Sequence, residues 1–216
     1  MPAAIDQIVQ LLKKQYYNNT SALAEVSNAR DPFKVLISCI LSLRTKDEVT
    51  AQASKRLFAR AETPEAMLLN LTKEELESLI YPVGFYHRKA EQILDIARVL
   101  IDQYESRVPD EIDELLKLKG VGRKTANIVV TMGFNKLGVA VDTHVHRISN
   151  RLGLVATKTP EQTEFALRKT LPKKYWIILN NLLVMHGQNI CTPISPKCSI
   201  CPISEYCKRV GVTRFR

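Results

Sequence analysis

The sequence predicts an all-α protein with short connecting loops. The alternation of polar and apolar residues that marks β-strands is nearly absent from its 216 residues. Apolar residues instead recur every three or four positions, and several of these stretches open with residues that cap helices. Hydrophobic residues make up 45% of the chain, which is enough apolar material for a core.

Helical stretches in the N-terminal half are defined by their apolar faces. They share the three-to-four-residue repeat and cover residues 5–12, 33–41, 47–60 and 89–104. The stretch 33–41 is apolar on nearly every side, so we expect it to be buried, with Cys39 as a small buried hydrophobe. A capping box, Thr72-Lys73-Glu74-Glu75, opens a further helix.

Capping residues mark the helices of the C-terminal half. We expect Asp110 to cap a short helix that ends near Leu118, and Asp142 to cap another. A cap, a proline suited to the first helical position and a capping-box glutamine follow in order in Thr159-Pro160-Glu161-Gln162. Helical periodicity also covers residues 125–134 and 175–186.

Charge is unevenly distributed along this basic chain, whose formal net charge is +9. Residues 61–114 contain 13 acidic and five basic side chains, whereas residues 168–216 contain nine lysines and arginines and one acidic residue, Glu205. Such asymmetry favours a polyanionic partner such as nucleic acid, and a charge that only aids solubility is the alternative. The chain has no secretory signal pattern and no apolar run of roughly 20 residues, so we expect a cytoplasmic protein without a membrane partner.

A glycine-rich turn separates two expected helices at Leu118-Lys119-Gly120-Val121-Gly122-Arg123-Lys124. Gly120 and Gly122 permit a tight turn with no Cβ in the way. Amides of the turn and of the following helix start can then bind a phosphate, which gives DNA binding without sequence preference. The alternative is an ordinary corner between helices, and the adjacent Arg123 and Lys124 favour phosphate binding.

Lys124 is expected in the first turn of the helix that follows the glycines. The positive end of the helix dipole and partial burial would both lower the pKa of Lys124. A neutral amine is a nucleophile that can form a Schiff base with a sugar carbon. Taken locally, a lysine that contacts phosphate is the more ordinary interpretation.

Asp142 directly follows an apolar run and precedes Thr143-His144. Its ordinary role is that of a helix cap. A carboxylate at this place could also stabilise positive charge on a sugar, or assist the deprotonation of a nucleophile. The local sequence leaves these roles open.

Four of the five cysteines lie within 17 residues, with the spacing Cys191-x6-Cys198-x2-Cys201-x5-Cys207. Clustered cysteines in a cytosolic chain indicate metal binding rather than disulfides. Four thiolates on one loop suit either a tetrahedral zinc ion or an iron–sulfur cluster. Zinc ribbons commonly use two C-x-x-C pairs and this loop has one, so the uneven spacing favours iron–sulfur.

Together these motifs resemble the endonuclease III family of helix–hairpin–helix DNA glycosylases. The similarity covers nearly the whole chain, and it rests on the cysteine spacing, on Val141-Asp142-Thr143-His144 and on Gly120-Val121-Gly122-Arg123-Lys124-Thr125-Ala126-Asn127. It implies two helical domains that flank a DNA cleft. One is a six-helix bundle with the hairpin at residues 25–136. The other joins residues 1–24 to 137–216 and holds a [4Fe-4S] cluster in the loop 191–207.

The resemblance also implies an activity. The family removes oxidised pyrimidines such as thymine glycol in base excision repair, and then cuts the strand 3′ to the abasic site by β-elimination. Lys124 matches the nucleophile that forms a Schiff base at C1′, Asp142 matches its partner carboxylate, and the four clustered cysteines match the cluster ligands. The implied partner is double-stranded DNA with damaged pyrimidines or abasic sites, bound by a monomer in the cytoplasm (in the nucleoid of a prokaryote).

Two further residues are expected to fill the space that a displaced nucleotide leaves in the duplex. Phe85 aligns with the family's apolar wedge, usually a leucine, although taken locally it could equally be a core aromatic. Arg44 stands where the family often has a glutamine. Arginine can stack, donate to the orphaned base and contact phosphate, so the preference for the opposite base stays open.

Two other functions fit parts of the sequence. A mismatch-specific glycosylase of the same superfamily would act on thymine or adenine, but those branches typically lack a lysine at position 124, and the adenine branch adds a C-terminal domain. A non-enzymatic DNA-binding protein with an iron–sulfur redox sensor would not need both Lys124 and Asp142. We therefore expect a bifunctional glycosylase and lyase.

Overall fold

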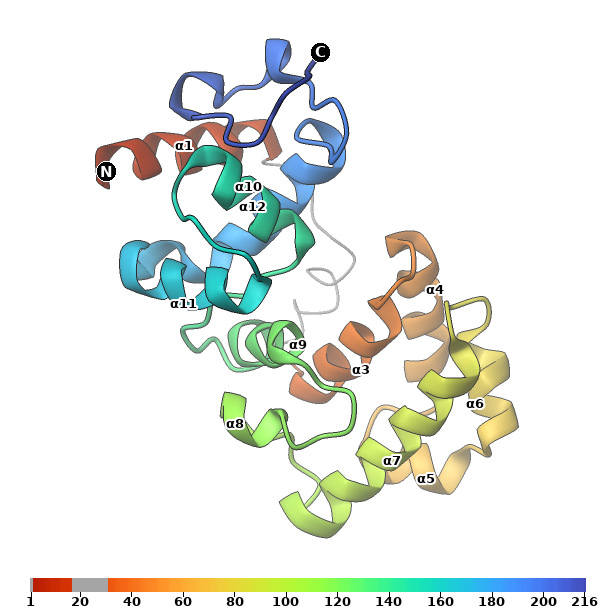
Figure 1. Ribbon diagram of the computed structural model, residues 1–216. Helices are drawn as coiled ribbons and strands as arrows, with labels where there is room; N and C mark the ends of the chain where they lie inside the picture. The colour runs from red at the N-terminus through yellow and green to blue at the C-terminus, as the bar shows by residue number, and fades with distance from the viewer. Residues whose placement is uncertain (1, 17–30) are drawn as a thin grey trace. The chain divides into compact units, whose positions relative to one another are not determined.

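The computed structural model describes residues 2–16 and 31–216, and every regular element within these ranges is helical (Figure 1). The α-helices are α1 (Pro2–Tyr16), α3 (Pro32–Ser42), α4 (Asp47–Phe58), α5 (Pro64–Asn70), α6 (Lys73–Ile80), α7 (Tyr86–Tyr104), α8 (Ile112–Leu115), α9 (Arg123–Ile128), α10 (Thr143–Leu152), α11 (Pro160–Thr170) and α12 (Trp176–Asn189). Shorter elements are the π-helix η1 (Val129–Gly133) and the 3-10 turns η2 (Lys173–Tyr175), η3 (Cys198–Ile200) and η4 (Ser204–Tyr206). The predicted all-α class is confirmed. Among the described helices, none is both long and apolar enough to cross a membrane.

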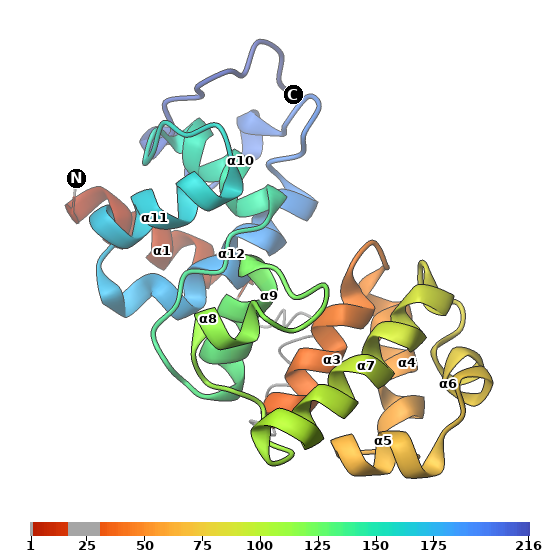
Figure 2. The ribbon, with the colours of Figure 1, turned by 60° about the horizontal axis from the view of Figure 1, so that its bottom comes forward.

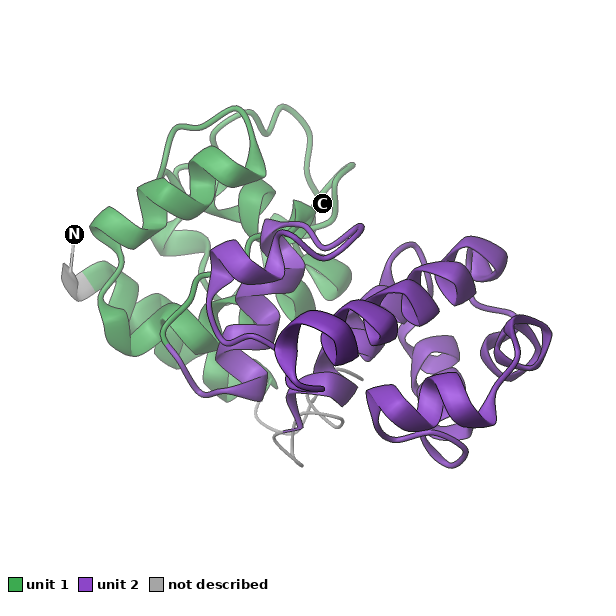
Figure 3. Ribbon diagram, turned by 90° about the horizontal axis from the view of Figure 1, so that it is seen from below, with its two compact units in different colours: residues 1–19, 137–216 green, residues 20–136 purple. Residues whose placement is uncertain are grey.

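The chain divides into two compact units, residues 20–136 and residues 1–19 with 137–216 (Figure 3). The domain boundary expected between residues 24 and 25 lies outside the described residues. The structure places the turn at Gly120 and Gly122 in the first of these units. Asp142 and the clustered cysteines belong to the second.

Helix α3 forms the centre of the unit 20–136. Eight of its side chains are buried, and they are Phe33, Val35, Leu36, Ile37, Ser38, Cys39, Ile40 and Leu41. Its N-terminus is stabilised by Asp31, whose carboxylate accepts from the amides of Phe33 and Lys34, and by a proline at the first helical position. Because it is apolar all round, α3 can pack against α4, α7, α9 and η1 at once.

Helix α7 is the longest in this unit, and α5 and α6 pack against it. The sequence predicted a helix over residues 89–104, but α7 begins three residues earlier, at Tyr86. Its N-cap is Phe85, whose φ of 59° is in the left-handed region. The capping box that precedes this turn is confirmed, because Thr72 and Glu75 satisfy each other's backbone amides at the start of α6.

The predicted helix 125–134 changes type halfway. It begins as α9 and continues as the π-helix η1 from Val129. The hydroxyl of Thr131 donates to the carbonyls of Asn127 and Ile128, and the Asn127 amide donates to the carbonyl of Arg123. Side chains that bond to carbonyls of the preceding turn compete with the regular ladder, which accounts for the wider turn.

The prediction that Asp110 caps the short helix was wrong. Helix α8 has Glu111 at its N-cap position, without a side-chain cap bond among the described residues. The carboxylate of Asp110 instead pairs with Lys136, 2.8 Å away, and that pairing lowers the pKa of Asp110. The Asp110 carboxylate, which the local pattern assigned to the helix as a cap, thus forms a long-range ion pair instead.

The unit formed by residues 1–19 and 137–216 has a core between α1, α10 and α12, with α11 packed on α10. Thr159 caps α11 as predicted, by accepting from the Gln162 amide. The expected capping box is not closed, because the Gln162 side chain accepts from the Lys158 amide instead. The helix predicted over 175–186 begins at Trp176, after a 3-10 turn, and runs to Asn189.

Candidate functional site

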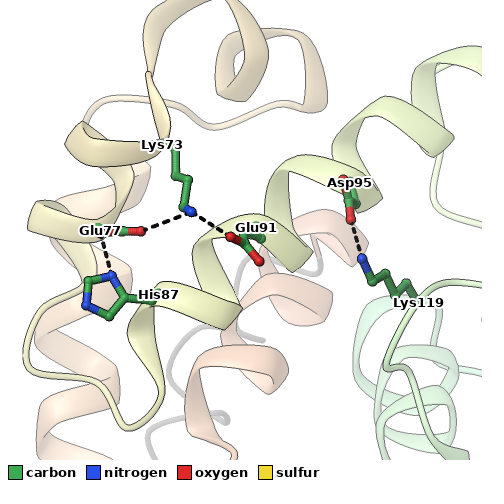
Figure 4. Close-up of polar contacts among 6 residues, drawn as sticks. All are labelled: Lys73, Glu77, His87, Glu91, Asp95 and Lys119. Atoms are coloured by element: carbon green, nitrogen blue, oxygen red, sulfur yellow. Dashed lines mark hydrogen bonds and ion pairs between the residues drawn. The ribbon is translucent and has the colours of Figure 1, made fainter.

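The glycine turn forms a hairpin between α8 and α9, which pack against each other (Figure 2). Two side chains of α7 hold it in place. Gln92 donates to the Lys119 carbonyl at 2.8 Å. Asp95 pairs with the Lys119 amine at 2.7 Å (Figure 4). The hairpin is therefore fastened to the long helix α7, which is the support that a loop needs to present its backbone in one conformation.

The two glycines of the hairpin occupy their positions for different structural reasons. Gly120 has a φ of +73°, which residues with a Cβ rarely adopt, and a Cβ there would also lie 2.6 Å from the Gln92 side-chain nitrogen, so the fold favours glycine at this position. Gly122 is exposed and has an extended backbone with φ −97°, and no described atom lies within 4 Å of a Cβ built on it. The described fold thus gives no steric reason for glycine at position 122, whereas close approach of a ligand would give one.

Hydrogen bonds decide which amides of the hairpin can reach a ligand. The Val121 amide donates to the Leu118 carbonyl at 3.0 Å and its side chain is buried, so Val121 shapes the turn rather than offering its N–H outward. Helix α9 begins at Arg123 with Gly122 as N-cap, and no described side chain caps it. The amides of its first turn have no acceptor within the helix, which makes them suitable for a phosphate.

Lys124 is the second residue of α9, as predicted, and it is half-buried. It lies near the buried Cys39 of α3, close enough for its charge to act on that thiol. Burial raises the pKa of Cys39 to about 12, and the Lys124 charge opposes this. Cys39 is therefore a protonated, apolar neighbour, and its predicted role as a small buried hydrophobe is confirmed.

Arg44 and Phe85, expected to act together, are neighbours in the structure. The Arg44 guanidinium lies 5.7 Å from the centre of the Phe85 ring. Both residues have left-handed backbones, with φ 54° and 59°. The Phe85 side chain is 58% exposed, so it is not the core aromatic that the local sequence allowed. An exposed large apolar side chain on a strained loop suggests an interaction role.

Sequence analysis missed Lys89, which lies beneath these two loops. Its ammonium group donates to the carbonyls of Leu41 and Leu43 at 2.8 and 2.6 Å, and to the Thr45 hydroxyl at 3.2 Å. Burial lowers the pKa of Lys89 to about 8. A signal was present, because Lys89 lies four residues before Ile93 on the apolar stripe of α7, where a charge is unexpected.

Asp142 caps α10 as predicted, with its Oδ1 accepting from the Val145 amide at 2.9 Å. Helix α10 also positions Arg147, which donates to the carbonyls of Cys191 and Gly187. Asp142 is half-buried, so the carboxylate is held in one orientation without being withdrawn from solvent. A fixed carboxylate of this kind can serve both as a cap and as a chemical group.

The four clustered cysteines line one pocket. Its other walls include apolar side chains, namely Ile148, Leu152, Ile190, Ile203 and Val212. Burial and, to a lesser extent, the other thiols of the cluster raise the pKa of Cys201 to about 11; burial also raises the pKa of Cys207. Four thiolates that line one apolar pocket would need positive charge beside them, which is what bound metal supplies.

Side chains around this pocket contact its sulfur atoms. Arg151 of α10 donates to the Cys191 sulfur at 3.3 Å, and to the carbonyls of Thr192 and Pro193. The buried His186 has Nε2 3.6 Å from the Cys201 sulfur, while its Nδ1 bonds to the Tyr16 hydroxyl. Such outer contacts orient ligands and adjust the charge on sulfur.

Two family models match the chain. Residues 37–173 match the helix–hairpin–helix GPD superfamily of base excision DNA repair proteins. Residues 191–207, which include all four clustered cysteines, match the iron–sulfur binding domain of endonuclease III. The cysteine loop is therefore an iron–sulfur binding segment.

Individual proteins show the same similarity. Endonuclease III of Thermotoga maritima is 53% identical over 178 residues, which cover 82% of this chain and 83% of that protein. The solved structure of a trapped endonuclease III–DNA covalent intermediate, an estranged-adenine complex, has a TM-score of 0.85 and 36% identity, and covers 97% of this chain and 96% of its own. A thermostable thymine-DNA glycosylase is also similar, with a TM-score of 0.81, 26% identity and 96% of each chain covered.

Proposed function

Because this chain belongs to the endonuclease III family of base excision DNA repair proteins, we propose that it is a bifunctional DNA glycosylase and abasic-site lyase. Its substrates are oxidised pyrimidines of the thymine glycol type in double-stranded DNA. It removes the base and then cuts the strand 3′ to the abasic site.

Lys124 carries the chemistry in this proposal. Its amine attacks C1′, the bond from C1′ to the base breaks and the base leaves, and the opened sugar remains joined to the lysine as a Schiff base. Loss of a proton from C2′ then expels the 3′ phosphate. The observation that supports this role most directly is the position of Lys124 in the first turn of α9, two residues after Gly122, where no described atom lies within 4 Å of a Cβ. A hairpin that binds phosphate there would hold the amine beside the sugar of the same strand.

Asp142 is the proposed partner carboxylate. One of its oxygens is fixed by the Val145 amide, so the group enters the reaction already oriented. Its negative charge would stabilise the positive charge that develops on the sugar as the base departs. A carboxylate can also accept the proton that the lysine loses on attack.

The hairpin and the exposed loops bind the DNA in this proposal. Gly120, Gly122 and Arg123 hold the phosphate backbone, and Val121 contributes to this DNA-binding hairpin by shaping the turn. Phe85 and Arg44 enter the duplex where the damaged nucleotide has left it, which suits their exposure and their contact with each other. The protein acts as a monomer, in the compartment that contains the DNA.

The iron–sulfur group is proposed to be a [4Fe-4S] cluster held by Cys191, Cys198, Cys201 and Cys207. Such a cluster takes one thiolate at each iron, and it suits a pocket that all four cysteines line together. Bound there, it would fix the loop that ends the chain's second unit. Purified protein should be brown and contain iron and sulfide in equal amounts, whereas a colourless protein with one zinc ion would contradict the assignment.

A panel of lesion duplexes, assayed with and without alkali, tests the proposed activity. Alkali cuts every abasic site, so it reveals base removal, whereas cutting without alkali reveals the lyase. We expect cutting of thymine glycol duplexes without alkali. Cutting only after alkali, and only at thymine–guanine mismatches, would favour the function named by the thymine-DNA glycosylase structure.

A further inference from the structure

Lys89 occupies a place where a lysine is costly. Its side chain is 5% exposed, and a buried ammonium loses hydration that must be replaced by other contacts. All three of its N–H groups have acceptors, in Leu41, Leu43 and Thr45. The group is thus fully satisfied, and every one of its bonds goes to the segment where α3 ends.

The acceptors explain why a positive charge suits this point. Leu41 belongs to the last turn of α3 and Leu43 is its C-cap, so their carbonyls lie at the negative end of the helix. Helices often end with a glycine in the left-handed conformation that satisfies such carbonyls. Here a side chain from α7 satisfies them instead, which ties the end of α3 to the helix that starts with Phe85.

Thr45 links Lys89 to the loop that contains Gly84 and Phe85. Its hydroxyl accepts from Lys89 and also from the Gly84 amide at 3.1 Å. The loops are in such close contact there that a Cβ on Gly84 would lie 2.6 Å from the Arg44 carbonyl oxygen. The two residues that flank this junction are Arg44 and Phe85, both in left-handed conformations that need support from their surroundings.

We propose that Lys89 is a positioning residue that holds Arg44 and Phe85 together for insertion into the duplex. The inference rests on the proposed function, and it adds a residue that takes no part in the bond changes of the reaction. Lys89 acts through Thr45. The Lys89 ammonium fixes the end of α3, and the Thr45 hydroxyl joins the loop of Arg44 to the loop of Phe85.

The test compares single-turnover base removal by Lys89→Met in two backgrounds. In the otherwise intact protein we expect a loss of at least tenfold on thymine glycol duplex. In a protein that already carries Arg44→Ala and Phe85→Ala, adding Lys89→Met should change the rate by less than twofold, because the side chains it positions are gone. Affinity for undamaged duplex, which depends on the hairpin, should stay within twofold.

Two further variants keep the test decisive. Thr45→Val removes the hydroxyl that joins the two loops, while Lys89 keeps its bonds to the carbonyls of Leu41 and Leu43, so it should reproduce the loss even if Lys89→Met folds poorly. Glu91→Gln, on the same helix as Lys89, breaks an exposed ion pair with Lys73 of α6 (Figure 4) and should leave the rate unchanged. Equal losses in both backgrounds, or no loss in the intact protein, would overturn the inference. Failure of the proposed function would differ, since the unaltered protein would then not act on the lesion.

Discussion

The Arg44 guanidinium and the Phe85 ring, from loops 41 residues apart in sequence, lie 5.7 Å from each other at the surface of one unit. A cation over an aromatic ring is attracted to it at that distance, and the attraction favours rotamers that keep the two side chains together. A wedge that is restrained before it meets DNA loses less entropy on insertion. The pair is thus a preorganised element of the DNA surface that we propose.

Replacement of Phe85 tests the wedge. Phe85→Ala should slow base removal at least tenfold, because the space left by the displaced nucleotide would no longer be filled, whereas Phe85→Leu should keep most of the rate. The side chain is 58% exposed, so neither change should alter the free energy of unfolding by more than about 0.5 kcal/mol. Single-turnover kinetics and thermal unfolding measure the two effects. Equal rates for Phe85→Ala and Phe85→Leu would remove Phe85 from this role.

Gly122 and Gly120 give a matched pair for the hairpin. Gly122→Ala should fold normally, since its backbone is extended and the added methyl group meets no described atom, but should weaken duplex binding about tenfold, or about 1.4 kcal/mol. Gly120→Ala should cost about 1–2 kcal/mol of stability, because φ is +73° there. Binding by fluorescence anisotropy and unfolding in urea separate the two. Normal affinity of Gly122→Ala would show that no phosphate approaches that position.

Asp142 combines a structural and a chemical role, and two substitutions separate them. Asparagine caps helices as well as aspartate, so Asp142→Asn should keep stability but lower the rate of base removal about a hundredfold or more. Asp142→Ala should lose the rate and also about 1 kcal/mol of stability. If Asp142→Asn retains the full rate at unchanged stability, the carboxylate is only a cap.

The pH dependence of stability should reveal the burial of Lys89. Its pKa is about 8 in the folded protein and 10.5 for an ordinary lysine, so between these values the unfolded chain holds more protons than the native one. The contribution of this group to the free energy of unfolding should therefore rise with pH between about 8 and 10.5, by at most about 1.4 kcal/mol per pH unit. The free energy of unfolding, measured in urea at several pH values, should differ between the unaltered protein and Lys89→Met by an amount that follows that slope. A difference that is flat or falls across this range would contradict the burial of a charged amine.

Sequence patterns predicted those parts of the site that local residues determine. The hairpin, the caps at Asp142 and Thr159 and the cysteine loop depend on residues within a few positions of one another, so the sequence displays them directly. The contacts of Lys89 with Leu41, Leu43 and Thr45 span 44 to 48 residues, and no local pattern encodes them. The error at Asp110 has the same cause, because its partner Lys136 lies in a distant segment.

The change from α9 to the π-helix η1 could not be read from periodicity either. An apolar repeat fits either form, and here the change is accompanied by hydrogen bonds from Thr131 and Asn127 to carbonyls of the preceding turn. Burial of Val129 and Val130 was foreseeable from the pattern, whereas the type of helix that buries them was not.

Borohydride reduction of the protein on thymine glycol duplex tests the central claim most directly, because it converts a Schiff base into a stable covalent adduct. We predict that the unaltered protein gives a trapped protein–DNA species, that Lys124→Gln gives none while still binding the duplex, and that Arg123→Gln still gives one. Trapping that survives Lys124→Gln would contradict the assignment of Lys124 as the nucleophile.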